Sequence, residues 1–321
     1  MRSERLWAYL LRRLLVAVPL LLLISLGVFA LVNLAPGDPA RALVGSRQAT
    51  PETLAAIREQ YHLDEPFVVQ YGSWLGDVLT GDLGRSIQGS QLVTTMIRQR
   101  LPLTIFLGVY GSLIALGLGI PLGMLAAFRR GTEVDRGIVT LGVLGVSAPS
   151  FATGILVLYV FGVVLGWFPT FGQGEGFLDR AWHLTLPAVA LGLSVLGLVI
   201  KITRASMIEE LQKDYIQFAR ARGLERRRVT LSYVLRNALI PVITAGGLVV
   251  VGLLTGAVLV EFTFGLPGLG SALVQAVVDR DIPVIQGIVL LLAAFVVIAH
   301  VAIDILYTLI DPRIRFGRVA A

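Results

Sequence analysis

Long apolar stretches alternate with short polar ones along most of this chain. A helix needs roughly 20 apolar residues to cross about 30 Å of hydrocarbon, and the sequence has six runs of about that length or longer. Within one short segment, only a helix satisfies every backbone polar group inside a bilayer. The pattern therefore predicts an all-α, polytopic membrane helical bundle. The six expected spans are residues 14–34, 103–128, 137–165, 186–207, 239–261 and 284–309.

The composition supports the membrane class. The 321 residues are 55% hydrophobic and 15% charged, with a mean hydropathy of +0.80, whereas soluble domains carry roughly 25% charged residues. We find no soluble domain or internal repeat, so residues 1–321 are interpreted as one transmembrane domain. A cleaved signal peptide is the alternative for the first span, because Arg12 and Arg13 precede an apolar run. That run is longer than a usual signal core, and no convincing cleavage site closes it.

The distribution of basic residues predicts the orientation. Of 27 Lys and Arg residues, 19 fall in the two terminal segments, in the loop after the second span, and between Lys201 and Arg236 at and beyond the end of the fourth span. The remaining segments hold eight basic residues against twelve acidic ones. Because Lys and Arg favour the cytoplasmic side, both termini are expected to be cytoplasmic.

Residues 35–100 form an extracytoplasmic region that is too long for a simple connection. Thr50-Pro51-Glu52 has the pattern of a helix start, with a capping residue, a proline at the first position and an acid in the first turn. Leu54, Ile57 and Tyr61 then share one apolar helical face. This region either packs on the bundle as a cap or helps to receive a binding protein.

Polar residues that might carry chemistry are few. His300 and Asp304 lie one turn apart near the inner end of the last span, where they suit either a proton relay or two charges near the interface. Glu261 is expected to be a hydrated charge at the outer end of the fifth span. The chain has no cysteine and three scattered histidines, so no metal site is expected. Neither lysine follows a glycine, which excludes a GxxxxGK[ST] phosphate loop. We expect neither a bound cofactor nor enzymatic activity in this chain.

Helix-breaking residues interrupt two of the spans. Ser147, Pro149 and Ser150 lie in the third span, and Gly246 and Gly247 in the fifth. Proline removes a backbone donor and kinks a helix, while small residues let helices approach closely. These residues suit either a lined pathway with moving elements or tight packing.

The loop at residues 208–228 is basic but compatible with a helix. It either rests on anionic lipid headgroups or forms a docking helix for a soluble partner, ended by Gly223 as a C-cap. The residues proposed for that docking helix are Asp214, Tyr215, Phe218, Ala219, Arg220, Ala221, Arg222, Gly223 and Leu224.

This loop resembles the cytoplasmic signature of ABC-importer permeases. The branch for dipeptides, oligopeptides and nickel has a form similar to D-Y-x-x-x-A-R-A-x-G-L followed by R-N-A-x-x-P. This chain matches it from Asp214 to Leu224 and again from Arg236 to Pro241. The general E-A-A core reads Gln217-Phe218-Ala219, so its first two positions depart from the family. Further blocks resemble the B-type subunits of that branch: Leu34–Ala40, Gly81–Ser86, Arg100–Pro102, Phe264–Gly270 and Leu309–Arg313.

The resemblance implies a type I ABC importer permease in the cytoplasmic membrane of a bacterium. Such a subunit pairs with a homologous second permease, here as a heterodimer, and receives substrate from an extracytoplasmic binding protein. Two ATPase subunits, which use ATP and Mg²⁺, would dock on residues 214–224. Tyr215, Phe218 and Ala219 would supply packing there, and Arg220 and Arg222 polar contacts.

The substrate that the resemblance implies is a di- or oligopeptide, with nickel, glutathione, haem and oligosaccharides as alternatives. Two other classes compete with an ABC permease: an ATP-independent secondary transporter or channel, and a membrane scaffold. The lipid bilayer is an expected partner, and nucleic acid is not.

Overall fold

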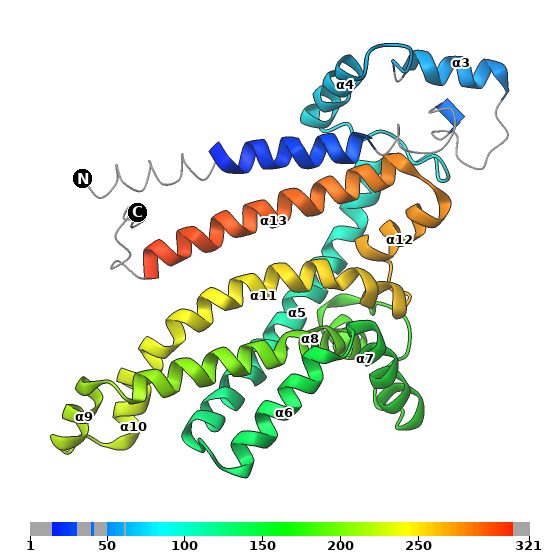
Figure 1. The fold of residues 1–321 in the computed structure, drawn as a ribbon. Coiled ribbons are helices and arrows are strands. Elements are labelled where there is room, and N and C mark those ends of the chain that lie inside the picture. Colours follow the sequence, from blue (N-terminus) through cyan, green and yellow to red (C-terminus); the bar gives the residue numbers. More distant parts are fainter. Residues whose placement is uncertain (1–14, 31–39, 42–49, 61, 311–321) are drawn as a thin grey trace. The chain divides into compact units, whose positions relative to one another are not determined.

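A computed structural model describes residues 15–30, 40–41, 50–60 and 62–310 (Figure 1). Helices dominate these residues, and only an isolated bridge between Arg85 and Leu92 has β pairing. The all-α prediction is confirmed. The helices are Leu15–Ala30, α3 (Pro51–Gln60), α4 (Phe67–Thr80), α5 (Val93–Phe128), α6 (Glu133–Ser147), α7 (Ser150–Val157), η1 (Leu158–Val164), α8 (Gly176–Leu211), α9 (Asp214–Ala221), α10 (Arg226–Arg228), η2 (Val229–Val234), α11 (Leu235–Thr263), α12 (Leu269–Asp279) and α13 (Ile282–Ile310).

Four helices are long and apolar enough to cross a membrane within the described residues, or five if one bent pair counts as a span. The four are α5, α8, the continuous run Arg226–Thr263, and Ile282–Ile303 of α13. They contain the second and fourth to sixth predicted spans, the last up to Ile303. The first predicted span is helical over Leu15–Ala30, and its remaining residues lie outside the described part. Both chain ends also lie outside it, so their orientation stays a prediction.

The third predicted span is not a straight helix. It divides into α6 and the pair α7–η1, which are bent by 106° at the break. Ala148 is extended, with φ −85° and ψ 130°, because a residue before proline disfavours the helical region. Pro149 then precedes the first residue of α7. The predicted interruption at Ser147–Ser150 is therefore confirmed, and the third predicted span is a bent pair of helices.

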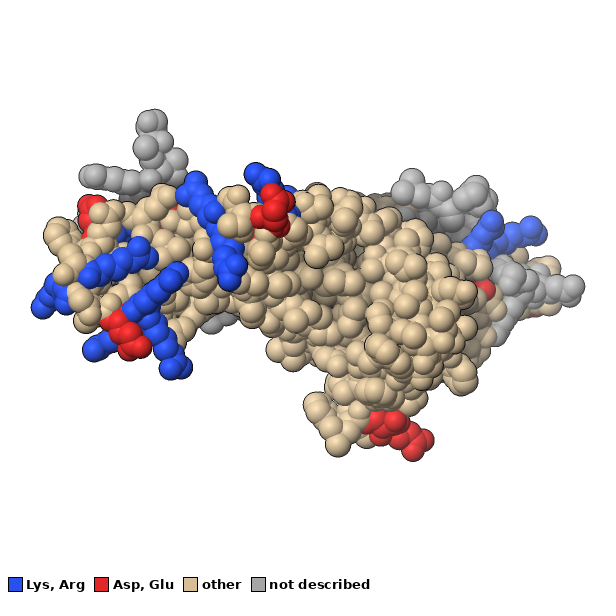
Figure 2. All heavy atoms as spheres, turned by 90° about the horizontal axis from the view of Figure 1, so that it is seen from below, with Lys and Arg blue, Asp and Glu red and all other residues tan. Residues whose placement is uncertain are grey.

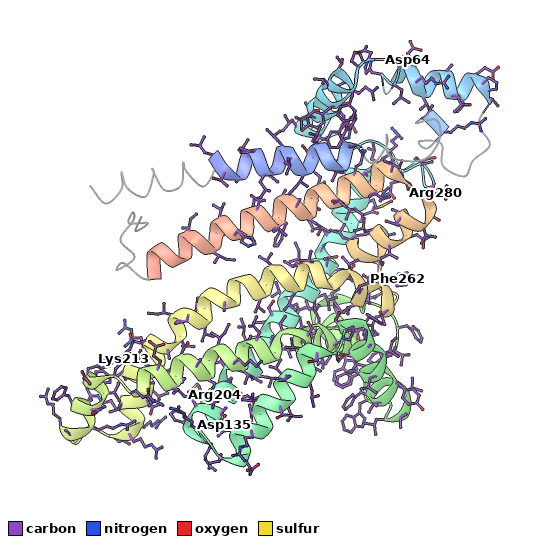
Figure 3. The ribbon with its side chains drawn as sticks, in the orientation of Figure 1. Asp64, Asp135, Arg204, Lys213, Phe262 and Arg280 are labelled. Atoms are coloured by element: carbon purple, nitrogen blue, oxygen red, sulfur yellow. The ribbon has the colours of Figure 1, made fainter. Side chains whose placement is uncertain are left out.

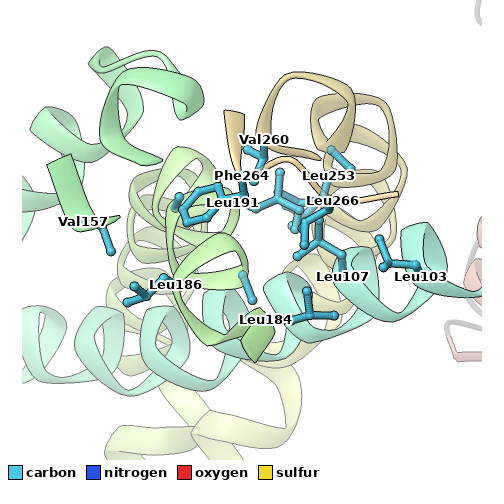
Figure 4. Close-up of a cluster of buried hydrophobic side chains, with 14 of the residues drawn as sticks. Leu103, Leu107, Val157, Leu184, Leu186, Leu191, Leu253, Val260, Phe264 and Leu266 are labelled. Carbon is cyan, nitrogen blue, oxygen red and sulfur yellow. The ribbon is translucent and has the colours of Figure 1, made fainter. Parts of the chain in front are cut away.

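The chain divides into two compact units, and the larger comprises Leu103–Leu266 with the described part of Ala302–Ile314. In this unit α8 packs against α6, α7 and α11. Its main apolar core includes Leu107, Leu191 and Leu253, all nearly inaccessible to solvent (Figure 4). At the α6–α8 crossing, a Cβ on Gly197 would lie 2.0 Å from the backbone oxygen of Gly142. Any larger residue at Gly197 would force these two backbones apart.

The other unit comprises the described parts of Met1–Pro102 and Pro267–Val301. Its core joins the start of α5 to α12 and α13 through Val93, Leu269 and Ile288. A loop at residues 81–92 is fixed to the start of α13, because the Ser86 hydroxyl donates to the buried Asp281 carboxylate at 2.6 Å.

The described part of residues 35–100, which the sequence predicts to be extracytoplasmic, packs on the first helix. The Tyr71 hydroxyl lies 2.7 Å from the Ser25 hydroxyl, and the Phe29 ring contacts Trp74 with ring centres 5.3 Å apart. The predicted helix start at Thr50 is also confirmed, since its hydroxyl accepts from the Thr53 backbone N–H at 3.3 Å. These contacts favour a cap that packs on the bundle. Docking of a binding protein stays a prediction.

The structure bears on expectations about three single residues. Glu261 is fully buried, so its interpretation as a hydrated charge is wrong; the turn after α11 folds back and Leu266 N–H donates to the Glu261 backbone oxygen at 2.9 Å. The helix α11 runs unbroken past Gly247, where a Cβ would lie 2.5 Å from the Ile303 side chain. Close packing therefore explains Gly247. His300 bonds the Val296 carbonyl at 2.8 Å, and the Asp304 side chain lies outside the described part.

Candidate functional site

The loop singled out in the sequence forms a short helix of its own. After α8 ends at Leu211, two residues turn the chain and α9 runs from Asp214 to Ala221. Asp214 in the first turn and Arg220 in the last suit the helix dipole. The chain then continues to α10, so two short helices, α9 and α10, follow α8 in this loop.

Gly223 ends α9 as the sequence predicts. Its φ of +75° is left-handed, a conformation that glycine adopts without steric cost. Gly223 N–H donates to the Arg220 carbonyl at 2.9 Å, and Leu224 N–H donates to the Ala219 carbonyl at 3.2 Å. These two bonds define a Schellman motif, which satisfies the last carbonyls of the helix.

One face of α9 is buried against its own chain. Ile216 is fully buried and Ala219 nearly so, three residues apart on the same face. They belong to an apolar cluster to which α8, α9, η2 and α11 all contribute. The fully or nearly fully buried members of this cluster, here called the loop core, are Ala127, Met207, Ile216, Ala219, Val229, Val234 and Ala238.

A polar network borders the loop core. Glu210, at the end of α8, is buried, and its carboxylate accepts from Lys213 Nζ at 2.6 Å and from the Tyr215 hydroxyl. Asn237 of α11 donates its side-chain amide to the Tyr215 oxygen at 2.8 Å and to the Tyr233 carbonyl at 3.1 Å. The Tyr215 hydroxyl therefore contacts both neighbouring helices.

The network shifts the proton affinities of two loop residues. Burial raises the pKa of Tyr215, and its bond to the Glu210 carboxylate raises it further. The bond to Glu210 also raises the pKa of Lys213. Both groups therefore keep their protons at neutral pH, so Tyr215 is a hydrogen-bond donor and Lys213 a cation there.

The opposite face of α9 is exposed and mixed in character. Phe218 is 70% exposed and Tyr215 38% exposed. Around them the exposed side chains are polar or basic, among them Gln217, Arg220 and Arg222. Figure 2 shows Lys and Arg side chains gathered at the end of the molecule where α9 and α10 lie. An exposed aromatic ring among cations suits a protein surface better than lipid tails.

The structure divides the predicted docking residues into two groups. Asp214, Tyr215, Phe218, Arg220, Ala221 and Arg222 are exposed, whereas Ala219 packs inward and Leu224 borders the loop core. Packing of Ala219 against a partner is therefore wrong, because its face of the helix is already covered. The pathway residues Ser147, Pro149 and Ser150 lie at the α6–α7 break, and Gly246 and Gly247 lie within α11.

Sequence reasoning missed Glu210, Ile216 and any role for Asn237. Ile216 precedes Ala219 by three residues, so helical periodicity alone signals a shared face. Glu210 offered a weaker signal, a carboxylate three residues before Lys213 on a helical loop. The contact of Asn237 with Tyr215 crosses 22 residues, and no local pattern reports it.

A second ion pair joins helices of the same unit. Asp135, nearly fully buried at the start of α6, accepts from Arg204 Nε at 2.6 Å and from Arg204 Nη2 at 2.8 Å (Figure 3). Asp135 also accepts from the Gly131 backbone N–H at 2.9 Å. A bidentate pair between an arginine and a carboxylate fixes the relative orientation of the two side chains as well as their distance. This ion pair therefore fixes α6 to α8, the helix that also carries Glu210.

The described residues thus combine apolar helices long enough to cross a membrane with a short helix fixed at one end of them, which is the architecture of an integral membrane protein. The chain belongs to the family described as the binding-protein-dependent transport system inner membrane component, which matches residues 119–316. The N-terminal component of the same transport systems matches residues 6–108. The protein is thus a permease subunit of ABC transporters, similar to the B-type subunits of peptide systems.

Individual relatives agree with that family. A Brucella abortus protein named as a peptide transport system permease is 43% identical over 313 residues, covering 96% of this chain and 99% of the relative. The oligopeptide transport system permease protein AppB of Bacillus subtilis is 38% identical over 315 residues, with the same coverage. A chain of the inward-facing MetNI methionine ABC transporter has a TM-score of 0.58 at 16% identity, covering 67% of this chain and 96% of that one. This last similarity concerns the fold alone.

Proposed function

We propose that this chain is the B-type permease of an ATP-driven, binding-protein-dependent importer in a bacterial inner membrane, and that its substrate is a di- or oligopeptide. It forms the translocation pathway with a second, different permease. Two separate ATPase subunits bind the exposed face of α9 and supply the energy, using ATP and Mg²⁺. An extracytoplasmic binding protein delivers the substrate.

The observation that carries the proposal is the two-sided nature of α9. A helix fixed along one face and exposed along the other transmits a push to the bundle, because it cannot slide freely against its own chain. The aromatic and basic side chains on the exposed face suit a protein partner. ATP binding and hydrolysis would bias the bundle between two states, since the ATPase pair binds them with different free energies.

The architecture is tested by purifying the tagged chain gently from native membranes. We expect a second permease, ATPase subunits and a binding protein to accompany it. A chain that is recovered alone, intact and monodisperse would favour an ATP-independent transporter. If cells that lack this chain still take up peptides at the wild-type rate, a membrane scaffold would be favoured.

The substrate is tested in liposomes that contain the purified complex and its binding protein. We expect ATP-dependent uptake of labelled di- or oligopeptides, competed by unlabelled peptide. Nickel, glutathione, haem and an oligosaccharide are supplied in parallel at the same concentration. Uptake of one of these in place of peptides would replace the substrate and leave the machinery unchanged.

A further inference from the structure

Two kinds of contact hold the inner face of α9, apolar packing and hydrogen bonds, and they restrict its position in different ways. The loop core alone holds α9 through apolar packing, and apolar attraction has no preferred direction. Ile216 and Ala219 therefore fix how closely α9 approaches the bundle more firmly than they fix its angle. Hydrogen bonds are directional, so the polar network beside the loop core is the element able to fix that angle.

One hydroxyl group joins three helices in that network. The Tyr215 hydroxyl, on α9, donates to the Glu210 carboxylate at the end of α8. The same oxygen accepts from the Asn237 side chain, in the first turn of α11, at 2.8 Å. A push on α9 therefore reaches α8 and α11 together. These helices pack on each other along their lengths.

The burial of Glu210 strengthens its bonds to Tyr215 and Lys213. The Glu210 side chain is 7% exposed, and its other oxygen is occupied by Lys213 at 2.6 Å. A buried carboxylate with both oxygens bonded is costly to disturb, because a lost partner leaves a desolvated acceptor. The bonds to buried Glu210 therefore hold one arrangement of these helices more tightly than apolar contacts do.

We infer that Glu210 and Asn237 are positioning residues, which fix the angle of α9 through the Tyr215 hydroxyl so that α8, α9 and α11 move as one body. This inference rests on the proposed function. Neither residue belongs to the proposed ATPase-binding face. Their loss should therefore impair the transmission of movement while ATPase binding persists.

The test uses the whole complex in liposomes, with ATP hydrolysis measured with and without the peptide-loaded binding protein. Glu210→Gln keeps the side-chain shape but retains only one of the two acceptor oxygens. We expect the stimulation of hydrolysis by the binding protein, and peptide uptake per ATP, to fall about tenfold, as for loss of a bond to a charged group. The amount of co-purified ATPase should stay at the wild-type level. The matched control is Glu209→Gln, which changes an exposed carboxylate one residue away.

Two further measurements keep the inference falsifiable if Glu210→Gln fails to fold. Asn237→Ala removes an exposed side chain and should produce the same partial uncoupling. Amide hydrogen exchange should speed up in α9 in both variants and stay slow in the Glu209→Gln control. The double variant Glu210→Gln/Asn237→Ala should uncouple little more than Glu210→Gln alone, because both act through one hydroxyl.

The outcomes separate the inference from the proposed function. Wild-type coupling in Glu210→Gln and in Asn237→Ala would overturn the inference. A loss of transport that follows a matching loss of bound ATPase would also overturn it, because the residues would then serve only docking or folding. A wild-type chain that retains no ATPase subunit would instead refute the proposed function.

Discussion

Two loops in this chain are each fixed to a helix end by one buried carboxylate, yet they differ in what they leave exposed. Glu210 holds α9, and Asp281 holds the loop at residues 81–92. On α9, Phe218 is left 70% exposed beside basic side chains. In the other loop Ser86 faces inward, and Leu83 packs on the core of its unit.

This difference shows that attachment of a loop to a helix end and exposure of side chains to a partner are separate properties. Both loops are attached firmly, so attachment alone does not indicate a partner. Only α9 combines attachment with an exposed aromatic ring in polar surroundings. In a membrane protein an exposed apolar side chain usually faces lipid, and the neighbouring charges of α9 argue against that environment. Substitutions that break one property and spare the other test this distinction.

The largest effect is expected for Gly223→Pro. Proline requires φ near −65° and has no N–H, whereas Gly223 has φ +75° and donates to Arg220 at 2.9 Å. Because proline cannot adopt that φ, the Schellman motif should be lost and ATP-dependent uptake abolished, while the chain still inserts. Uptake is compared at equal protein level with Gly223→Asn, which tolerates the left-handed region. Normal uptake in the proline variant would refute the role of α9.

Asp281→Ala should chiefly destabilise the protein. It removes the acceptor of the buried Ser86 hydroxyl, which typically costs about 1–3 kcal/mol. We expect a lower thermal midpoint of the purified protein and an unchanged amount of co-purified ATPase per folded chain. Asp77→Ala, an exposed carboxylate on α4, serves as the control. Equal midpoints for the two variants would show that Asp281 does not hold its loop.

Phe218→Ala should have the opposite signature. Its ring is mostly exposed, so the thermal midpoint should stay within error of wild type. Retention of the ATPase subunits should weaken by about 1–2 kcal/mol, as for an interface aromatic residue. Phe262→Ala removes another exposed ring, from the far end of α11 (Figure 3), and should leave retention unchanged. Undiminished ATPase retention in Phe218→Ala would remove this ring from the interface.

The smallest effect is expected for Ser86→Ala. It deletes one hydroxyl, and the Asp281 carboxylate keeps its contact with the Gln88 backbone N–H at 3.3 Å. The loss in unfolding free energy should be about 1 kcal/mol, measured as a midpoint shift smaller than that of Asp281→Ala. Ser73→Ala, exposed on α4, is the control. A shift as large as that of Asp281→Ala would mean that Ser86 carries the whole attachment.

The two loops also show which features the sequence could predict. Helix α9, its C-cap at Gly223 and the helix start at Thr50 depend on residues a few positions apart, and periodicity with cap signals predicted them. The bond between Ser86 and Asp281 joins residues 195 positions apart. Neither side of that bond carries a local signal.

The remaining errors differ in origin. Glu261 was expected to be hydrated because it lies near a helix end, but its side chain is fully buried. Ala219 was assigned to a partner because the family motif marks it, whereas its position relative to Ile216 places it on the buried face. The break at Pro149 was predictable from proline itself, although the angle of 106° was not.

Because α8 is long, a small tilt of this helix moves its end by several ångströms. Its 36 residues extend about 54 Å at 1.5 Å per residue, well beyond the roughly 30 Å of a bilayer's hydrocarbon. Glu210 stands one residue from one end, and the one proline inside the helix, Pro187, lies about a third of the way from the other. The part from Pro187 to Glu210 is thus a stiff arm of about 35 Å. Tilting that arm by about 5° displaces its far end by about 3 Å, enough to change which side chains meet there.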